Sequence, residues 1–381
     1  MINIPFNKAA VTKKEHFYIS EVLASGVMAG DGPKSRACEK LLSSMTGCDD
    51  ILLTPSCTAA LEMAAILCDV QPGDEVIVPS YTFVSSASAF VLRGAKIIFV
   101  DVDANTMNIN LDAVESAISP KTKVVVPVHY AGISCDMDRL MALSLKHGFF
   151  VVEDAAQAVM STYKGRALGT IGHLGCFSFH ETKNYTAGGE GGALLVNDEA
   201  MVARAEVVRE KGTDRKAFFS GQVDKYTWRD MGSSYLMSEL QAAYLLAQLE
   251  SAEEINNKRV AIWREYNNHL SAQLRAEDIL NIPAYNEHNA HLYYIKFSSN
   301  LARSNFIALM KEKGIYCPFH YVPLHSSPYG SNVGVFMGDD CVTTKHSEQL
   351  VRLPIYFNMN EEELVYVIRS VTELLQDVRT K

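Results

Sequence analysis

One lysine lies in a polar, glycine-dense segment between two short apolar runs. The runs are Cys176–Phe179 and Ala193–Val196, and both have strand composition. Glycine lets the backbone approach a bound group closely or adopt positive φ, and the segment contains it at positions 188, 189, 191 and 192. Lys183 is therefore our candidate reactive amine. A mobile hairpin tip with a solvated lysine is the open alternative.

Two carboxylates end a buried apolar run upstream. The run Phe149–Gln157 reaches its first acids at Glu153 and Asp154, where a parallel strand would pass into a ligand-binding crevice. Pyridoxal phosphate (PLP) requires a lysine that holds it as a Schiff base and an acid beside its pyridine nitrogen. Lys183 and Asp154 fit these two roles. Alternatively, Asp154 is the N-cap of a helix beginning at Ala155.

Two further strand ends carry residues suited to the same cofactor. Ser56, Thr58 and Ala59 follow a short strand and precede a helix, where backbone N–H groups and hydroxyls bind phosphate. A plain N-cap at Ser56 or Thr58 is the alternative. After the next strand, Phe83, or as second choice Tyr81, could lie over a cofactor ring, although aromatic residues mostly serve core packing.

The pattern along the chain predicts an α/β protein. Apolar strands at Lys96–Val100, Val124–Val128 and Phe149–Val152 alternate with helical segments, which indicates a largely parallel sheet covered by helices. A polar loop is expected over Gly212–Met231, followed by one long helix over Tyr235–Asn257. The last third mixes helices and strands as an α+β domain would. We place the boundary between residues 1–250 and 251–381.

Two histidines lie in the proline-containing segment Phe319–His325. As metal ligands, His320 and His325 lack a third partner in the sequence, so no metal site is predicted. Polar groups facing a cleft between the domains, or satisfied structural histidines, are the remaining interpretations.

Composition excludes several classes of protein. The 381 residues carry a formal net charge of −9 without a basic run, which argues against nucleic-acid binding and against binding to anionic membranes. The eight cysteines have no paired spacing, so neither a disulfide scaffold nor a metal site is expected. The N-terminal residues lack a signal-peptide pattern, and no apolar run is long enough to span a membrane. We therefore expect a cytoplasmic protein.

Five segments in this order resemble the DegT/StrS-type family of sugar aminotransferases, and the likeness covers nearly the whole chain. They are Pro55–Ala60, Pro79–Val84, Val151–Gln157, Phe177–Asn184 and His320–His325. The resemblance implies a type I PLP-dependent aminotransferase fold, with a large PLP-binding α/β domain (1–250) and a small C-terminal α+β domain (251–381). It also implies a homodimer with shared active sites.

The same resemblance assigns roles to residues. Lys183 would hold PLP, Asp154 would meet the pyridine nitrogen, Gln157 would lie on the ring-hydroxyl side, and Phe83 would stack on the ring. Thr58, Ala59 and Ser178 would hold the phosphate. Many relatives add an asparagine from the neighbouring subunit, and this sequence has the shorter Ser234 there. Candidate substrate contacts, among them cations for carboxylates and a diphosphate, are Tyr81, Arg215, Lys225, Arg229, His320 and Tyr321.

The implied reaction moves an amino group from L-glutamate to C4 of dTDP-4-keto-6-deoxy-D-glucose. Its products are dTDP-4-amino-4,6-dideoxy-D-galactose and 2-oxoglutarate. Three alternatives remain open: another nucleotide-linked ketosugar or a gluco product, a dehydratase, and a non-catalytic regulator with the same fold. The dehydratases that we compare have histidine in place of the lysine, whereas this chain keeps Lys183. The intact lysine–aspartate pair and the acidic charge argue against the regulator.

Overall fold

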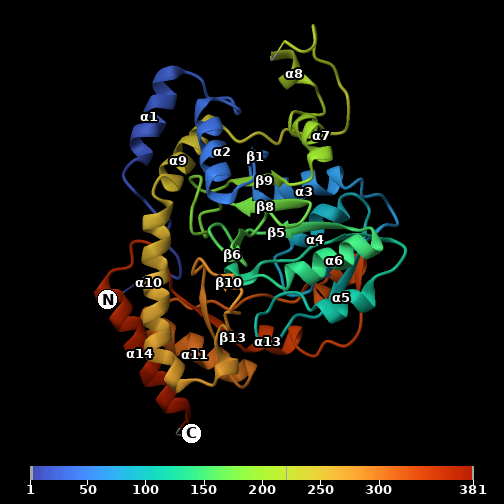
Figure 1. Ribbon diagram of the computed structural model, residues 1–381. Coiled ribbons are helices and arrows are strands. Elements are labelled where there is room, and N and C mark those ends of the chain that lie inside the picture. Colours follow the sequence, from blue (N-terminus) through green and yellow to red (C-terminus); the bar gives the residue numbers. More distant parts are fainter. Residues whose placement is uncertain (1–2, 220, 380–381) are drawn as a thin grey trace.

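A central eight-stranded sheet organises the computed structural model, which describes residues 3–219 and 221–379. The strand order is β1-β9-β8-β5-β4-β2-β3-β12. Figure 1 labels the first four of these strands, β1, β9, β8 and β5, in this order. From β8 to β12 all neighbours are parallel, whereas β9 runs antiparallel to both β1 and β8. The strands are β1 (Ile51–Thr54), β2 (Glu75–Pro79), β3 (Lys96–Val100), β4 (Thr122–Val125), β5 (Phe150–Asp154), β8 (Leu174–Ser178), β9 (Gly192–Val196) and β12 (Gly334–Phe336). The predicted, mostly parallel α/β sheet is confirmed.

Helices cover both faces of this sheet because its strands are apolar on both sides. In β2, for example, Ile77 packs into one core cluster while Val76 and Val78 pack into the other. The first cluster lies under α2 (Pro33–Thr46), α5 (Leu111–Ala117), α6 (Met137–His147) and α9 (Glu239–Leu249). The second lies under α3 (Cys57–Leu67), α4 (Ser85–Val91) and α7 (Glu199–Arg209). The result is a three-layered α/β/α arrangement.

A second core forms around a two-stranded antiparallel sheet. The strands are β11 (Tyr293–Lys296) and β13 (Leu350–Leu353). Helices that pack on this core are α10 (Ala252–Leu270), α11 (Asn300–Glu312) and α14 (Glu361–Arg379). The predicted boundary at residue 250 falls where α9 ends, but β12 returns to the edge of the large sheet beside β3. The division into 1–250 and 251–381 therefore stays a prediction.

The remaining strands are short. A three-stranded sheet joins β6 (Thr162–Tyr163), β7 (Arg166–Ala167) and β10 (Asn286–Glu287). The short helices are α12 (Gly330–Val333) and α13 (Thr343–Gln349), and the N-terminal helix is α1 (Glu15–Ser25). The 3₁₀ turns are Tyr130–Gly132, Ser271–Gln273, Ala276–Asp278 and Leu324–Ser326.

The predicted single helix over 235–257 is wrong. Ser238 and Gln241 form a capping box that starts α9, and the chain leaves helical geometry at Ser251 before α10 begins. The apolar face of α9 is buried within the chain, with Ala242, Leu245 and Leu249 in the core. Because this face is already covered, α9 gives no support to the expected dimer.

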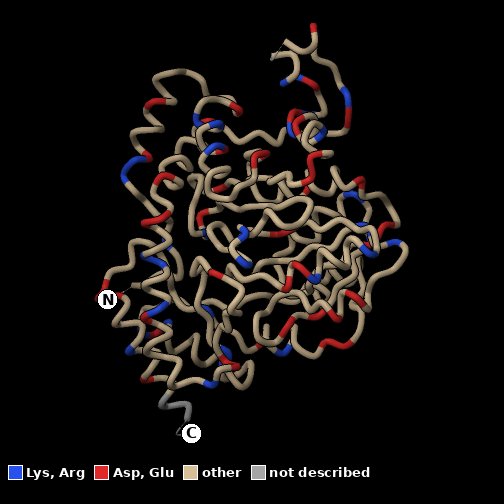
Figure 2. The backbone as a smooth tube through the Cα atoms, in the orientation of Figure 1, with Lys and Arg blue, Asp and Glu red and all other residues tan. Residues whose placement is uncertain are grey.

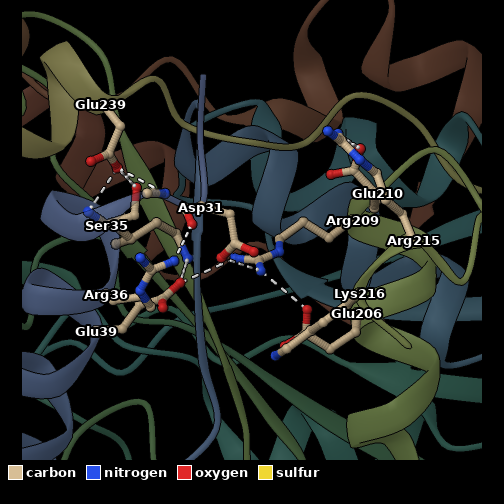
Figure 3. A network of polar contacts seen from close by, with 12 residues as sticks. Asp31, Ser35, Arg36, Glu39, Glu206, Arg209, Glu210, Arg215, Lys216 and Glu239 are labelled. Carbon is tan, nitrogen blue, oxygen red and sulfur yellow. Dashed lines mark hydrogen bonds and ion pairs between the residues drawn. The ribbon is translucent and has the colours of Figure 1, made fainter. Parts of the chain in front are cut away.

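The predicted loop over 212–231 contains structure of its own. It carries α8 (Arg215–Phe219) and stands away from the sheet as an arm (Figure 1). Thr213 and Trp228 form a β-bridge across its base. Beneath the arm, the buried Arg209 forms ion pairs of 3.1 Å with each of Asp31, Glu39 and Glu206 (Figure 3). This network connects the end of α7, from which the arm continues, to α2 and to the loop before it.

Basic and acidic residues are intermixed over the molecule (Figure 2). Of the helices in the described residues, none has the length and apolar content needed to cross a bilayer. Within the same ranges, no group of three His, Cys, Asp or Glu side chains is placed to hold a metal ion. All eight cysteines are free thiols.

Candidate active site

A cavity of about 580 Å³ opens at one edge of the large sheet. Strands β1, β2, β5 and β8 all end at this edge, because β1 points the same way as the parallel strands. Ligands bind at this end of the strands in open α/β sheets. The wall includes Ser56, Thr58, Phe83, Asp154, Gln157, Ser178, Lys183, His291, His320, Tyr321 and Arg352.

Lys183 lies on the cavity wall, five residues after β8 ends. Its backbone N–H donates to the carbonyl of His180 at 2.9 Å, which fixes a turn at the start of the hairpin connection. The side chain is partly accessible through the cavity but otherwise surrounded by protein. That burial lowers the pKa of the Lys183 amine, although the carboxylate of Asp154 acts in the opposite direction. A greater share of the amine is therefore neutral and nucleophilic than in a solvated lysine.

Asp154 ends β5 and faces the same cavity. Its Oδ2 accepts from Ser86 Oγ at 2.6 Å, and its Oδ1 accepts from the Ala156 N–H at 3.1 Å. No helix begins at Ala155, because the next element after β5 is the strand β6, so the interpretation of Asp154 as a helix N-cap is wrong. The arrangement presents an oriented carboxylate to a group in the cavity.

Glu153, the neighbouring acid, points to the other side of the strand. It accepts 2.6 Å bonds from the Ile171 and Gly172 N–H groups and a 2.8 Å bond from Gly169, and it pairs with His129 Nε2 at 2.7 Å. Burial raises the pKa of Glu153, but His129 and the backbone donors outweigh it and lower the pKa overall. Glu153 does not line the cavity. Its hydrogen bonds and its pairing with His129 therefore stabilise the fold.

Hydroxyl groups gather near the N-terminus of α3. Ser56 is the N-cap and accepts from the Ala59 N–H at 3.1 Å, so the cap interpretation is confirmed for Ser56. Thr58 Oγ1 lies 2.7 Å from Ser85 Oγ, and Ser178 adds a fourth hydroxyl from β8. Ser56, Thr58, Ser85 and Ser178 all line the cavity, and a helix N-terminus with hydroxyls suits a phosphate.

Polar and aromatic side chains from both halves of the chain line another part of the wall. Gln157 Nε2 donates to the Tyr321 hydroxyl at 3.1 Å, and the His320 ring stacks on that of Tyr321 with 3.6 Å between centroids. His320 Nδ1 lies 3.2 Å from the Tyr130 hydroxyl. Burial, together with the nearby cations, lowers the pKa of His320 well below its ordinary value, so the ring is neutral near pH 7. His320 therefore supplies hydrogen bonding rather than positive charge.

The structure places the other predicted site residues away from the cavity wall. Tyr81 is buried, and its hydroxyl donates to the His320 carbonyl at 2.6 Å, so it packs behind the wall. Ala59 is buried in α3. His325 bridges Ser80 Oγ at 2.7 Å and Asp340 at 3.3 Å, which fits the interpretation as a satisfied structural histidine.

The predicted contacts on the arm are also outside this cavity. Arg215 pairs with Glu210, Arg229 pairs with Asp214, and Ser234 is exposed. Lys225 is exposed as well. Since Ser234 was expected to act on the neighbouring subunit, its role stays a prediction, as do those of the three arm cations.

Sequence reasoning did not select several residues that line the cavity. Phe6 and Asn7 come from the N-terminal segment, while His291 and Arg352 come from the second core. Asn7 Nδ2 donates to the Glu181 carbonyl at 2.9 Å, which connects that segment to the lysine hairpin. An arginine inside the apolar strand Leu350–Leu353 is the one signal in the sequence that could have directed attention to Arg352.

Comparison with known proteins agrees with this geometry. The model of the DegT/DnrJ/EryC1/StrS aminotransferase family matches residues 10–372. The chain belongs to that family. The spore coat polysaccharide biosynthesis protein SpsC of Bacillus subtilis (strain 168) is 34% identical over 383 residues, covering 98% of this chain and 97% of that protein. The recognition of the family from its motifs is confirmed.

Solved structures of the family superpose on nearly the whole chain. The aminotransferase TlmJ of Streptoalloteichus hindustanus has a TM-score of 0.90 at 28% identity, covering 99% of this chain and 100% of that one. The PLP form of Spr1654 from Streptococcus pneumoniae has a TM-score of 0.87 at 29% identity, with coverages of 99% and 100%. The predicted type I fold, the sugar aminotransferase activity and the cofactor PLP are therefore confirmed.

The residues of the cavity fit that cofactor. The cavity is lined by an amine of lowered pKa, an oriented carboxylate and a helix N-terminus with hydroxyl groups. Lys183 would hold the aldehyde carbon, Asp154 the pyridine nitrogen, and Thr58 and Ser178 the phosphate.

Proposed function

We propose that the protein transfers the amino group of L-glutamate to C4 of dTDP-4-keto-6-deoxy-D-glucose. The products are dTDP-4-amino-4,6-dideoxy-D-galactose and 2-oxoglutarate, as in the enterobacterial dTDP-4-amino-4,6-dideoxygalactose transaminase of common-antigen synthesis, which the sequence resembles. The observation that carries the aminotransfer is the placement of Lys183 and Asp154 on one cavity. The sugar and nucleotide are supported by resemblance of the motifs.

The residues divide the chemistry between them. PLP supplies the electron sink that stabilises charge at a carbon losing its proton. Asp154, oriented by Ser86 and the Ala156 N–H, would present its carboxylate to the pyridine nitrogen, which must stay protonated for that chemistry. Lys183 Nζ removes the proton from Cα of the donor and returns one to C4 of the sugar, because its lowered pKa suits it to both transfers.

We further propose a cytoplasmic homodimer with shared active sites. Apolar side chains beside the cavity support it: Phe83 is 58% and Val84 54% exposed in the single chain. On α1, Phe17 is 60% exposed. Adjacent exposed apolar side chains, such as Phe83 and Val84, favour a surface that meets a partner more than single ones do. A monomeric mass in dilute solution would contradict the dimer.

A coupled assay tests the substrate. The purified protein with PLP and L-glutamate is offered dTDP-, UDP- and GDP-linked 4-keto-6-deoxy sugars, and NMR reads the C4 configuration of the product. We expect the dTDP sugar to have the highest kcat/KM and the product to be galacto. Preference for another nucleotide, or a gluco product, would overturn the substrate assignment but leave the aminotransfer intact.

A further inference from the structure

Two asparagines hold His291 on the cavity wall. The ring Nδ1 of His291 lies 2.9 Å from Oδ1 of Asn184, and its backbone N–H donates to Oδ1 of Asn289 at 3.1 Å. Both asparagines are almost fully buried. Because Asn184 directly follows Lys183 in the sequence, the hairpin that carries the lysine also holds the histidine.

The hydrogen-bond network determines which nitrogen of the His291 ring carries the proton. Asn184 Nδ2 donates to the carbonyl of Asn289 at 2.9 Å, and a carbonyl can only accept, so the oxygen of Asn184 is the atom that faces His291. The ring Nδ1 must therefore donate to this oxygen. A neutral imidazole has one N–H group, so Nε2 is unprotonated and can only accept.

The His291 ring is neutral near pH 7. Burial, and then the charges of Lys183, Arg259 and Arg352, lower the pKa of His291 well below its ordinary value. Among these charges, that of Lys183 has the largest effect, whereas the charge with the largest effect on His320 is that of Arg352. Of these two histidines, His291 is therefore the one that responds most to the lysine.

The backbone around His291 is fixed by the fold. The preceding residue, Ala290, is fully buried and has a φ of +49°, which residues with a Cβ rarely adopt. Asn289 Nδ2 donates to the carbonyl of Gln157 at 2.8 Å, and Arg259 Nη2 donates to the carbonyl of His291 at 2.7 Å. Strained backbone that its surroundings hold in place is a feature of functional sites.

Two polar atoms on the cavity wall complement each other. Among the described residues, neither Nε2 of His291 nor Nζ of Lys183 has a hydrogen-bond partner, and neither is a buried atom. Both residues line the cavity, so both atoms open into it. The lysine nitrogen can donate whether it is an amine or an ammonium, and Nε2 can accept from it in either state.

We propose that His291 is a catalytic residue whose Nε2 accepts a hydrogen bond from Nζ of Lys183 during both proton transfers. Lys183 becomes an ammonium when it removes the proton from Cα of the donor, and it is one again before it gives a proton to C4 of the sugar. A poorly solvated ammonium needs an acceptor, and Asp154 is assigned to the pyridine nitrogen. His291 takes up no proton and only directs the N–H group. The inference rests on the proposed function, because it requires these two transfers by Lys183.

His291→Phe keeps a flat ring but removes the acceptor. Single-turnover rates are measured for the PLP form with L-glutamate and for the amino form of the cofactor with the ketosugar. We expect both rates to fall about tenfold to a hundredfold, because each half-reaction loses a hydrogen bond to a charged group. Cα-deuterated L-glutamate should show a larger isotope effect than in wild type, because proton transfer becomes slower. His291→Gln, whose Oε1 can accept, should recover part of both losses.

His288→Phe is the matched control. His288 lies in the same segment, burial lowers its pKa to about 4, and its Nδ1 accepts from the Ala290 N–H at 3.3 Å. Its ring packs against Trp263 and does not line the cavity. We expect wild-type rates in both half-reactions. Calorimetric titration with glutarate should give wild-type affinity for both phenylalanine variants, and thermal unfolding checks the fold.

Two readouts use the apoprotein and do not depend on turnover. Long-range ¹H–¹⁵N NMR spectra, with the His291 signals assigned from their absence in His291→Gln, should show the Nδ1–H tautomer. An acceptor at Nε2 favours the protonated lysine, so His291→Phe should lower the pH midpoint of PLP incorporation, whereas His288→Phe should leave it unchanged. The other groups that act on the Lys183 amine remain in both variants; they are Asp154, Cys57 and Arg352.

Four results would overturn the inference: an Nε2–H tautomer, a loss confined to one half-reaction, unchanged rates, or an unshifted midpoint. Weaker glutarate binding to His291→Phe would overturn it as well, because the loss would then lie in the shape of the cavity. If His291→Phe does not fold, Asn184→Ala, which frees the ring tautomer, should show a smaller loss in both half-reactions. A wild type that does not react with L-glutamate would instead overturn the proposed donor, while the two apoprotein readouts still test the contact.

Discussion

Ser86 Oγ donates a 2.6 Å hydrogen bond to Oδ2 of Asp154. Thr82 Oγ1 lies 2.8 Å from the same Ser86 hydroxyl, and both serine and threonine are almost fully buried. The carboxylate is therefore oriented from behind by α4 and its preceding turn, while its open side meets the cavity.

The hydrogen bond from Ser86 to Asp154 predicts a large loss of kcat when Asp154 is replaced and a smaller loss when Ser86 is replaced. Asp154→Asn should lower kcat by more than about a hundredfold, because the negative charge opposite the pyridine nitrogen is lost. Ser86→Ala removes one hydrogen bond to a charged group, so its cost should be about tenfold. Steady-state kinetics measures both. Near-normal rates in Asp154→Asn would exclude the electron-sink role.

The lowered pKa of Lys183 predicts how the apoprotein takes up its cofactor. Only the neutral amine attacks the aldehyde, so the rate of PLP incorporation should rise with pH and level off below 10.5, the ordinary lysine value. Stopped-flow absorbance across the pH range measures the midpoint. A midpoint at or above the ordinary value would contradict burial of the amine.

The pair of Glu153 and His129 predicts acid sensitivity of the fold. A carboxylate whose pKa is lowered in the folded state adds stability above its unfolded pKa, near 4.5, and loses it as the pH falls through the lowered folded value. Glu153→Gln should cost about 3 kcal/mol or more, because the amide cannot accept all the bonds that the carboxylate accepts. Urea unfolding at several pH values measures both effects. As a control, substitution of the exposed Glu312 by glutamine (Glu312→Gln) should change neither the free energy of unfolding nor its dependence on pH.

The backbone of Gly192 packs closely against the backbone of Ser56 and Cys57 at the N-terminus of α3. A Cβ at this position would lie 2.4 Å from the carbonyl carbon of Ser56 and 2.5 Å from the Cys57 nitrogen. Gly192→Ala should therefore displace the N-terminus of α3 and weaken PLP binding. Gly26→Ala, where φ is +70° but nothing lies within 4 Å, should cost about 1 kcal/mol and leave PLP binding unchanged. Equilibrium titration with PLP distinguishes the two.

The sequence predicted the centre of the site because its residues lie at strand ends. Asp154 and Lys183 each follow an apolar run, and strand ends at one sheet edge meet regardless of their distance in sequence. Glu153 shows the limit of that reasoning: it shares the motif, but strand alternation points it to the opposite face.

Long-range pairing could not be predicted in the same way. The capping box at Ser238 breaks a continuous helical periodicity, and nothing local indicates that β12 joins β3. Arg352 reaches the cavity because the second core packs across the strand ends, so its environment depends on tertiary structure alone. Arg215 pairs with Glu210 at the base of the arm and Arg229 pairs with Asp214 on it, which composition does not reveal.

Covalent attachment of PLP to Lys183 tests the central claim most directly. The protein with bound PLP is reduced with borohydride, digested and mapped by mass spectrometry, with Lys183→Ala and the exposed Lys146→Ala as comparison. We predict the phosphopyridoxyl group on Lys183 in wild type and Lys146→Ala, and neither adduct nor turnover in a folded Lys183→Ala. An adduct on another lysine, or full activity in Lys183→Ala, would contradict the account.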